Sequence, residues 1–395
     1  MGSNPDARTI LRHLLLFVLT FVSAAITGTL FVGHTADIPE SFILFSSEGM
    51  RTYLDMVIWE GLVFASMLLG FLGVHEFGHY YAAKRHGIDT SLPYFIPFPI
   101  SPIGTLGAVI RIRSRIENSR KMFDVGASGP IAGFIVALFI LLYGFATLPE
   151  PDYLQNFAGH DAINNYIAEH GSFPDEPVID TNDNETEVMV LGNTLLFGLL
   201  ASFFEDVPPM WELYHYPFLF AGWLGLFFTA LNLLPVGQLD GGHILYTLIG
   251  YRRHRIVARL FVLLVLSLAG LGAIPLITSL ISGYAIPVTL TSWVIWALIS
   301  LFLVDRGFRH ELYWTLFGWA AILLFNLLLL TLFDPSVFSG FTIWIFWSLF
   351  IVFFTGIEHP PVTFEEPLSG RRKILGWLCM ILFILCISPN PIYFY

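Results

Sequence analysis

Three ionisable side chains that could do chemistry together stand in one short segment, His75-Glu76-Phe77-Gly78-His79. Residues i and i+4 of a helix share one face, so His75 and His79 can hold a single metal ion. Glu76 then stands beside that ion and can take a proton from a water bound to it, as in the H-E-x-x-H zinc hydrolases. The alternative is a pair of packed helix histidines beside an unrelated glutamate. The spacing predicts a metal centre that activates water.

An apolar segment, L-V-F-A-S-M-L-L-G-F-L-G at 62–73, precedes this motif and is typical of a membrane span. Ionisable residues inside a span are costly and usually functional, which favours the metal site over simple packing. At a helical rise of about 1.5 Å per residue, the two histidines lie roughly 7–14 Å from the basic residue Lys84 that ends the span. The predicted chemistry is therefore intramembrane.

A catalytic zinc ion needs a third protein ligand and one open position for water. Glu60 is on the same predicted helix as Glu76, but about 24 Å from it at 1.5 Å per residue. Glu358-His359 follows a later span and is expected at the surface. The remaining candidate is Asp240, in the segment A-L-N-L-L-P-V-G-Q-L-D-G-G-H at 230–243.

The backbone around Asp240 is suited to returning a carboxylate to the level of the histidines. Pro235 cannot continue helical hydrogen bonding, and glycines follow at 237, 241 and 242. Irregular backbone is tolerated at membrane depth only where it is buried in protein or lines a water-filled cavity. The open alternative is that Asp240 is the N-cap of a short helix that begins there.

The composition excludes an ordinary soluble protein. Hydrophobic residues make up 55% of the 395-residue chain and charged residues only 12%, whereas a soluble domain has roughly 25% charged residues. The mean hydropathy of +0.71 agrees with this. The formal net charge of −11 and the lack of a basic domain argue against nucleic-acid binding. We expect an all-α polytopic membrane protein whose surroundings are the lipid bilayer.

The apolar runs set the expected number of spans, because a bilayer core takes about 20 helical residues. Such runs occur at about 10–32, 54–83, 124–148, 216–234, 256–282, 287–304, 311–333, 340–357 and 373–389. They predict about nine transmembrane helices. The first run is longer than a signal-peptide core of roughly 7–15 residues, so we interpret it as a retained anchor. The shorter run at 191–204 is expected to be a surface or re-entrant helix.

The distribution of charge gives the expected orientation. With the N-terminus in the cytoplasm, all but Arg51 of the 19 Lys and Arg residues fall on the cytoplasmic side, as the positive-inside rule requires. The loop at 149–190 has many acidic residues and no Lys or Arg, which is typical of an outward, solvated segment. We expect a multi-pass protein of the cell inner or cytoplasmic membrane, with its metal centre in the cytoplasmic half.

These residues together resemble the site-2 protease family of intramembrane zinc metalloproteases. H-E-F-G-H on the second predicted span is followed by the family's second signature, N-x-x-P-x-x-x-x-D-G. The positions that match the second signature are Asn232, Pro235, Asp240 and Gly241. S-G-P-I-A-G at 128–133 is similar to the segment found between the two signatures. P-Y-F-I-P-F-P at 93–99 and E-H-P-P-V at 358–362 resemble the subgroup that includes the chloroplast members, and the likeness covers about 55–250.

The resemblance implies roles for these residues. One zinc ion per chain is held by His75, His79 and Asp240, Glu76 is the general base, and Asn232 hydrogen-bonds the scissile peptide or its oxyanion. The implied substrates are single-span membrane proteins, such as anchored transcription regulators or signal-peptide remnants, cut in or near the span. A PDZ domain needs roughly 80–100 residues. The stretch 149–215 offers 67 residues and is an acidic loop, so no PDZ domain is expected in it.

The predicted organisation has three parts. Residues 1–52 form an N-terminal anchor helix and outer loop, 53–255 the catalytic core, and 256–395 a C-terminal transmembrane bundle without a derived role. Within the core, the segment T-L-G-A-V-I-R-I-R-S-R-I at 105–116 alternates apolar and basic residues from Val109 to Ile116, which predicts a strand of a small cytoplasmic-side β-hairpin or re-entrant element. One hypothesis is that the strand pairs with an unwound substrate. The other is a basic loop attracted to anionic lipid.

Other functions could use the same residues. A divalent-metal transporter could pass ions through His75, His79 and Asp240, and its transport would survive the replacement of Glu76 by Gln. An inactive scaffold that binds membrane partners is a second rival. A metalloprotease of the prenylated-protein class would be expected to use a later Glu as its third ligand. The oligomeric state does not follow from the sequence.

Two further residues stand near the predicted site. Ser128, in G-A-S-G at 126–129, matches the G-x-S-G of rhomboid serine proteases. No histidine base for it is evident on another span, and the small residues around it more simply allow close helix packing. His243, three residues after Asp240, is a candidate for a supporting contact rather than a metal ligand.

Overall fold

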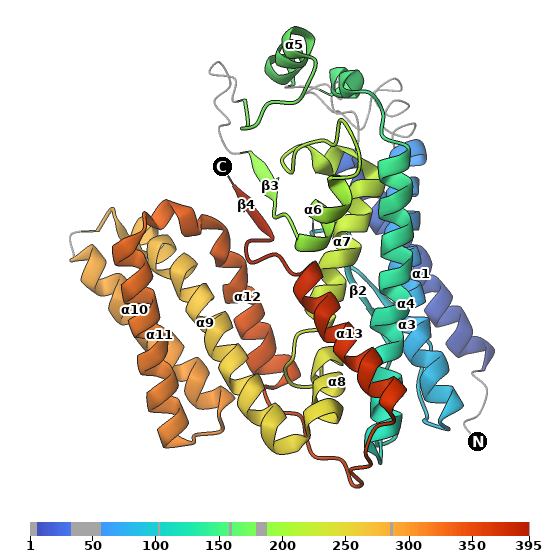
Figure 1. Ribbon diagram of the computed structural model, residues 1–395, viewed down its shortest axis with the longest axis vertical. Helices are drawn as coiled ribbons and strands as arrows, with labels where there is room; N and C mark the ends of the chain where they lie inside the picture. The colour runs from blue at the N-terminus through green and yellow to red at the C-terminus, as the bar shows by residue number, and fades with distance from the viewer. Residues whose placement is uncertain are drawn as a thin grey trace.

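The computed structural model describes residues 6–32, 57–101, 103–157, 160–178, 188–284 and 287–394. Arg51, the basic residue expected on the outer side, lies outside these residues, as does part of the acidic loop beyond residue 178. Within the described residues the chain is mostly helical and has two small sheets of two strands each (Figure 1). This agrees with the expected all-α fold that carries a small β element.

The first group of helices surrounds the predicted metal motif. Its members are α1 (Ala7–Val32), the π-helical turn η2 (Val57–Gly61), α3 (Leu62–Arg85), α4 (Ser119–Ala146), α7 (Pro217–Asn232) and α8 (Asp240–Ile249). α4 packs between α3 and α7, and α1 covers the outer face of α3 (Figure 1). Large apolar side chains such as Phe64, Leu141 and Trp223 are fully buried between these helices. One apolar core therefore holds α1, α3, α4 and α7, whereas Ile244 and Leu245 of α8 pack in a neighbouring cluster with Phe123.

A second group of helices forms the C-terminal bundle. Its members are α9 (Tyr251–Ile281), α10 (Val288–Gly307), α11 (Leu312–Leu332), η5 (Pro335–Thr342), α12 (Ile343–Phe350), η6 (Ile351–Thr355) and α13 (Gly370–Cys386). α9 is the central helix, because α10, α11, η5 and α12 all pack on it. α13 leaves the bundle and lies across α4, α7 and α8 (Figure 1). The last helix thus ties the bundle back to the first group.

Seven helices among the described residues are long and apolar enough to cross a membrane. They comprise α1, α3 with the end of η2, α4, α9, α10, α11 and the continuous helical segment Pro335–Thr355. The runs at 216–234 and 373–389 form shorter helices, α7 with 16 residues and α13 with 17. The chain is thus a multi-pass helical membrane protein, and nine spans stays a prediction.

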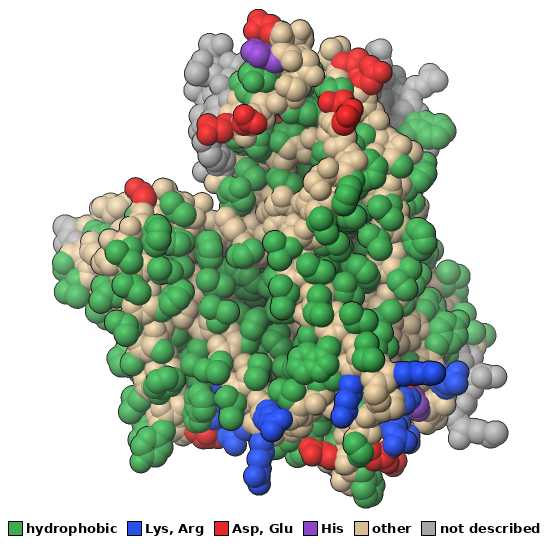
Figure 2. All heavy atoms as spheres, viewed as in Figure 1, with side chains coloured by type: hydrophobic (Ala, Val, Ile, Leu, Met, Phe, Trp, Pro, Cys, Tyr) green, Lys and Arg blue, Asp and Glu red, His purple; other side chains and the backbone are tan. Residues whose placement is uncertain are grey.

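The two ends of the molecule differ in charge. Figure 2 shows Lys and Arg side chains gathered at the lower end of the face in view, whereas the upper end carries acidic side chains. The upper end contains η3 (Pro151–Asn156), α5 (Asp161–His170), α6 (Leu195–Ala201) and η4 (Leu213–His215). α6 lies within the run at 191–204 and has only seven residues, so it is too short to span a bilayer, as expected.

The strand observed in the β element predicted at 105–116 is shorter than the predicted segment. β2 (Thr105–Val109) pairs antiparallel with β1 (Tyr94–Pro97), so that Tyr94 faces Val109 and Phe95 faces Ala108. Beyond Val109 a single bridge joins Ile112 to Thr90. Backbone contact continues there in an irregular form, because the amide of Ser91 donates to the carbonyl of Arg111 at 3.0 Å. The amide of Arg111 donates at 2.9 Å to the hydroxyl of Ser91 in place of a carbonyl. A second sheet pairs β3 (Met189–Leu191) with β4 (Ile392–Phe394) near the acidic end.

Candidate metal centre

The H-E-x-x-H residues lie on one uninterrupted stretch of α3, in the interior of the molecule. His75, Glu76 and His79 have exposed fractions of 3%, 8% and 6%. The helix continues without a break to Arg85, so the 3.6-residue period places the two imidazoles on one face, one turn apart. Their Nε2 atoms lie 3.1 Å from each other. The helix alone therefore supplies two converging nitrogen donors.

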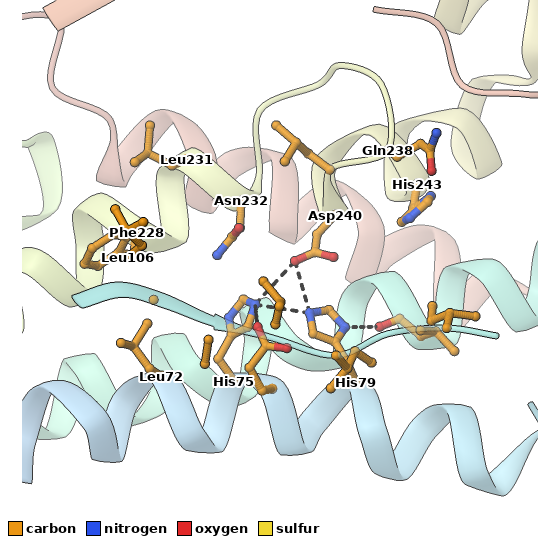
Figure 3. Close-up of a pocket in the computed structure, with 18 of the residues that line it drawn as sticks. Leu72, His75, His79, Leu106, Phe228, Leu231, Asn232, Gln238, Asp240 and His243 are labelled. Atoms are coloured by element: carbon orange, nitrogen blue, oxygen red, sulfur yellow. Dashed lines mark hydrogen bonds and ion pairs between the residues drawn. The ribbon is translucent and has the colours of Figure 1, made fainter. Parts of the chain in front are cut away.

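The irregular segment after α7 brings Asp240 to the two histidines. α7 ends at Asn232, and the chain then runs without regular helix to Asp240, where α8 begins. Gly237 adopts a left-handed backbone with φ of 53°, a conformation that glycine adopts without strain. The N-cap of α8 is Leu239. The alternative in which Asp240 caps the helix therefore does not describe this structure, in which the carboxylate points toward α3 (Figure 3).

The three donor atoms meet at a spacing that suits one zinc ion. Oδ2 of Asp240 lies 3.2 Å from Nε2 of His79 and 3.4 Å from Nε2 of His75 (Figure 3). Zinc–nitrogen and zinc–oxygen bonds of about 2.0–2.2 Å in a tetrahedron place donor atoms roughly 3.3–3.5 Å apart. The observed separations between the three donor atoms match this requirement closely. The residues present fit a zinc site with three protein ligands.

Contacts from α4 hold the imidazole of His79 in its orientation. Nδ1 of His79 lies 2.7 Å from the carbonyl oxygen of Val125, and because a carbonyl only accepts, Nδ1 carries the proton. The lone pair is then on Nε2, which faces the site, as is usual for metal-ligating histidines. A Cβ at Gly129 would overlap this imidazole, and a Cβ at Gly78 would lie 2.6 Å from the backbone oxygen of Ser128. The glycines allow α3 and α4 to approach closely.

Glu76 and Asn232 face the same cavity as the three donors. The cavity has a volume of about 360 Å³, and Gly107 to Ile110, at the end of β2, form one of its walls. Oε1 of Glu76 lies 3.9 Å from Nε2 of His75. Asn232 is the last residue of α7, and its side chain points into the space in front of the histidines (Figure 3). All five residues singled out from the sequence thus surround one cavity.

The two other residues considered near the site have different surroundings. Ser128 donates its hydroxyl to the carbonyl of Val125 in its own helix at 2.8 Å. Nδ1 of His243 lies 2.8 Å from Nε2 of His359, and His243 lines the cavity beside Asp240. The geometry agrees with a supporting contact for His243.

The expectation that Glu358-His359 lies at the surface is wrong. The exposed fractions of Glu358 and His359 are 8% and 6%. Arg259 of α9 donates from Nε to Oε1 of Glu358 at 2.7 Å, and Arg255 donates to the same oxygen at 2.9 Å. Burial lowers the pKa of the His359 imidazole. The two arginines compensate the buried carboxylate, which allows the segment after η6 to fold inward.

This buried segment supports the backbone that carries Asp240. The amide of Gly237 donates to the carbonyl of Ile357 at 2.9 Å, and a Cβ at Gly237 would overlap the backbone oxygen of Gly356. Sequence reasoning missed this support. Two arginines spaced i, i+4 on α9, together with a lone Glu after an apolar run, were the available signal.

The fold and the site define a multi-pass helical membrane protein with a buried centre of two histidines and one carboxylate that fits zinc. Comparison with known sequences then places it more narrowly: the chain belongs to peptidase family M50, which it matches over residues 63–272. M50 is the site-2 protease family, so the resemblance seen in the two signatures is confirmed.

Individual relatives are similar over part of their length. The chain is 31% identical over 191 residues to "Probable zinc metalloprotease EGY2, chloroplastic" of Oryza sativa subsp. indica, covering 48% of this chain and 30% of the relative. It is 28% identical over 250 residues to "Probable zinc metalloprotease EGY1, chloroplastic" of Arabidopsis thaliana, covering 61% of this chain and 40% of the relative. The chain thus covers 30% and 40% of the length of these two curated relatives. No solved structure matches it.

Proposed function

We propose that this protein is an intramembrane zinc endopeptidase that hydrolyses a peptide bond in or near the transmembrane segment of single-span membrane proteins. The observation that carries the proposal is the spacing of the donor atoms of His75, His79 and Asp240, 3.1 to 3.4 Å apart, inside helices of membrane length. The relatives' names as zinc metalloproteases support the same activity. One zinc ion per chain, held by these three residues, is part of the proposal.

The residues around the cavity have distinct roles in this reaction. His75, His79 and Asp240 would hold the zinc ion, which would polarise the scissile carbonyl and lower the pKa of a water molecule. Glu76, beside the donors on α3, accepts the proton of the attacking water and delivers it to the leaving nitrogen. Asn232 donates an amide hydrogen bond to the substrate carbonyl oxygen from the opposite wall of the cavity. His79, oriented by Val125, keeps its lone pair directed at the site.

The edge of β2 opposite β1 pairs with no other strand among the described residues, and it supports a way of holding the substrate. β2 has β1 on one side, and Gly107 to Ile110 form the cavity wall next to Glu76. A helical substrate must unwind before its peptide bond can be attacked, and an unwound segment can add to a strand edge through backbone hydrogen bonds. N-methylation of the substrate backbone is expected to abolish cleavage at the positions that pair. Uniform tolerance of N-methyl groups would favour the lipid-binding interpretation of Arg111 and Arg113.

The membrane orientation and the division of the chain belong to the same proposal. The Lys and Arg side chains at one end support an N-terminus in the cytoplasm of the inner or cytoplasmic membrane (Figure 2). This orientation places the metal centre in the cytoplasmic half. Residues 53–255 supply all the proposed site residues, which supports their treatment as the catalytic core. Residues 1–52 then anchor the core, and 256–395 support it from the other side.

The decisive experiment compares wild type with Glu76→Gln in reconstituted vesicles that contain single-span reporter proteins. Fragments are identified by mass spectrometry, and zinc is measured in both proteins. We expect cleavage by wild type alone, with zinc retained in both, because Gln keeps the size of Glu but cannot accept a proton. Cleavage that survives Glu76→Gln would refute the assigned base. Zinc in both proteins without cleavage in either, together with zinc flux across the vesicles, would indicate a divalent-metal transporter.

A further inference from the structure

A second group of side chains that could bind a metal ion lies far from the centre formed by His75, His79 and Asp240. His160, Glu212 and His215 bring one donor atom each within 4.8 Å of one another. His160 directly precedes α5, and His215 lies two residues before the start of α7. α7 then runs its full length to Asn232, which at 1.5 Å rise per residue puts about 24 Å between this group and the cavity of the first centre. The two groups are therefore separate sites.

The two imidazoles converge on one carboxylate oxygen. Oε2 of Glu212 lies 3.0 Å from Nε2 of His160 and 3.7 Å from Nε2 of His215. These distances bracket the roughly 3.3 Å that separates the donors of a tetrahedral zinc ion. Two histidines and one glutamate are also a donor set that zinc uses in proteins, whereas calcium and magnesium prefer oxygen ligands alone.

The cluster is largely withdrawn from solvent and acidic in its charge. The side chains of Glu212 and His215 are each 8% exposed and that of His160 is 14% exposed. Between Lys121 and Arg252 the chain contains no Lys or Arg. A buried carboxylate is stable only when it is paired or coordinates a metal. A divalent cation shared by the carboxylate and the two imidazoles would balance the charge of Glu212.

Aromatic rings fix the positions of the two imidazoles. The ring of His215 lies with its centroid 4.2 Å from that of Phe157 and 4.3 Å from that of Tyr214. Phe157 also contacts His160, at a centroid distance of 5.9 Å. An apolar shell of this kind limits solvent access and holds ligand side chains in place around a metal.

From this geometry we propose that His160, Glu212 and His215 bind a second divalent transition-metal ion, with zinc as the best fit. Its role is structural: it fastens the segment made of η3 and α5, at the acidic end of the molecule, to the N-terminal end of α7. The proposal is independent of the peptidase activity, because none of its ligands faces the cavity of the first centre.

The test is a metal count on the full chain, purified in detergent without a polyhistidine tag. The protein is equilibrated with Zn²⁺, dialysed, and analysed by inductively coupled plasma mass spectrometry against quantitative amino-acid analysis. We expect two zinc ions per wild-type chain, one in Glu212→Gln and in His160→Gln, and one in the double variant His75→Gln/His79→Gln. His170→Gln, on the exposed side of α5, is the matched control and should retain both ions.

Each other result has a definite meaning. One zinc ion in wild type that disappears in His75→Gln/His79→Gln would overturn the second site and leave the peptidase proposal intact. Two ions retained in both Glu212→Gln and His160→Gln would also overturn it. If the variants of the second site fail to fold, His75→Gln/His79→Gln decides alone. One zinc ion bound to that variant supports the proposal, whereas a variant that binds no zinc refutes it.

Discussion

Replacement of Gly129 by alanine is expected to disable the metal centre by displacing His79. The three heavy atoms nearest to a Cβ at this position all belong to the His79 imidazole, which the Cβ would overlap. Non-bonded carbon atoms normally lie about 3.5–4.0 Å apart, so the ring must retreat by about 1 Å or more. Nε2 of His79 is now 3.1 Å from Nε2 of His75. A shift of that size removes it from the reach of a zinc ion with bonds of about 2.0–2.2 Å.

The expected loss is large and can be measured in two ways. Zinc affinity, from competition with a chromogenic chelator, should weaken by about 10–100-fold, as for other changes that misplace a ligand. Cleavage of a reporter in vesicles should fall by about 100-fold, the usual result of a 1 Å misplacement. Overpacking also lowers the free energy of unfolding by about 1–3 kcal/mol, so a thermal melt is recorded alongside.

Gly70→Ala is the matched control, because Gly70 lies on α3 and a Cβ there meets nothing within 4 Å. It should keep wild-type zinc affinity and cleavage, with unchanged or slightly raised stability. If Gly129→Ala also keeps both activities, α3 and α4 can move apart at this point. The argument that glycine is required for the position of His79 would then be wrong.

Three other changes test the site and its support. Asp240→Asn should weaken zinc affinity by more than the roughly 10–100-fold typical of outer-shell changes, in the same chelator assay. Arg259→Ala leaves Glu358 buried without its main partner and should cost about 3–5 kcal/mol in denaturant unfolding, whereas Arg259→Lys, which keeps the positive charge, should cost less; equal losses would contradict compensation by charge and assign the effect to the fork-shaped guanidinium. Hydrogen bonds from Arg259 hold the pKa of Glu311 below its ordinary value. A group of this kind adds stability above its unfolded pKa and loses it as the pH falls through its folded pKa, so Glu311→Gln should flatten the acid side of the stability curve.

The sequence predicted the chemistry of the site better than its support. His75, Glu76 and His79 follow from helical periodicity, and Pro235 with its neighbouring glycines indicates that α7 must end and the chain turn back. These are local patterns. The burial of Glu358-His359 depends on arginines of α9, about a hundred positions earlier in the chain, so its signal in the sequence is spread over two distant segments and neither segment reveals it alone. Likewise, no alternation of apolar residues indicates that the amide of Arg111 pairs with the hydroxyl of Ser91 instead of a carbonyl where the regular ladder ends.

The second metal group shows the same limit. His160 and His215 stand 55 positions apart in a stretch whose only clear signal is acidity. They come together only in the folded chain, where Phe157 and Tyr214 pack against His215. Isolated histidines in such a stretch form no motif with a recognisable spacing, whereas the histidines of H-E-x-x-H do.

The hydrogen bond between Gly237 and Ile357 has a consequence for the order in which the protein matures. The ribosome makes Ile357 120 residues after Gly237. At about 5–20 residues per second, that interval lasts roughly 6–24 s. Throughout it, the turn that bears Asp240 lacks its backbone partner, although both histidines are already in the membrane. A nascent chain therefore carries an unfinished centre, and completion of the site is delayed until most of the polypeptide has been synthesised.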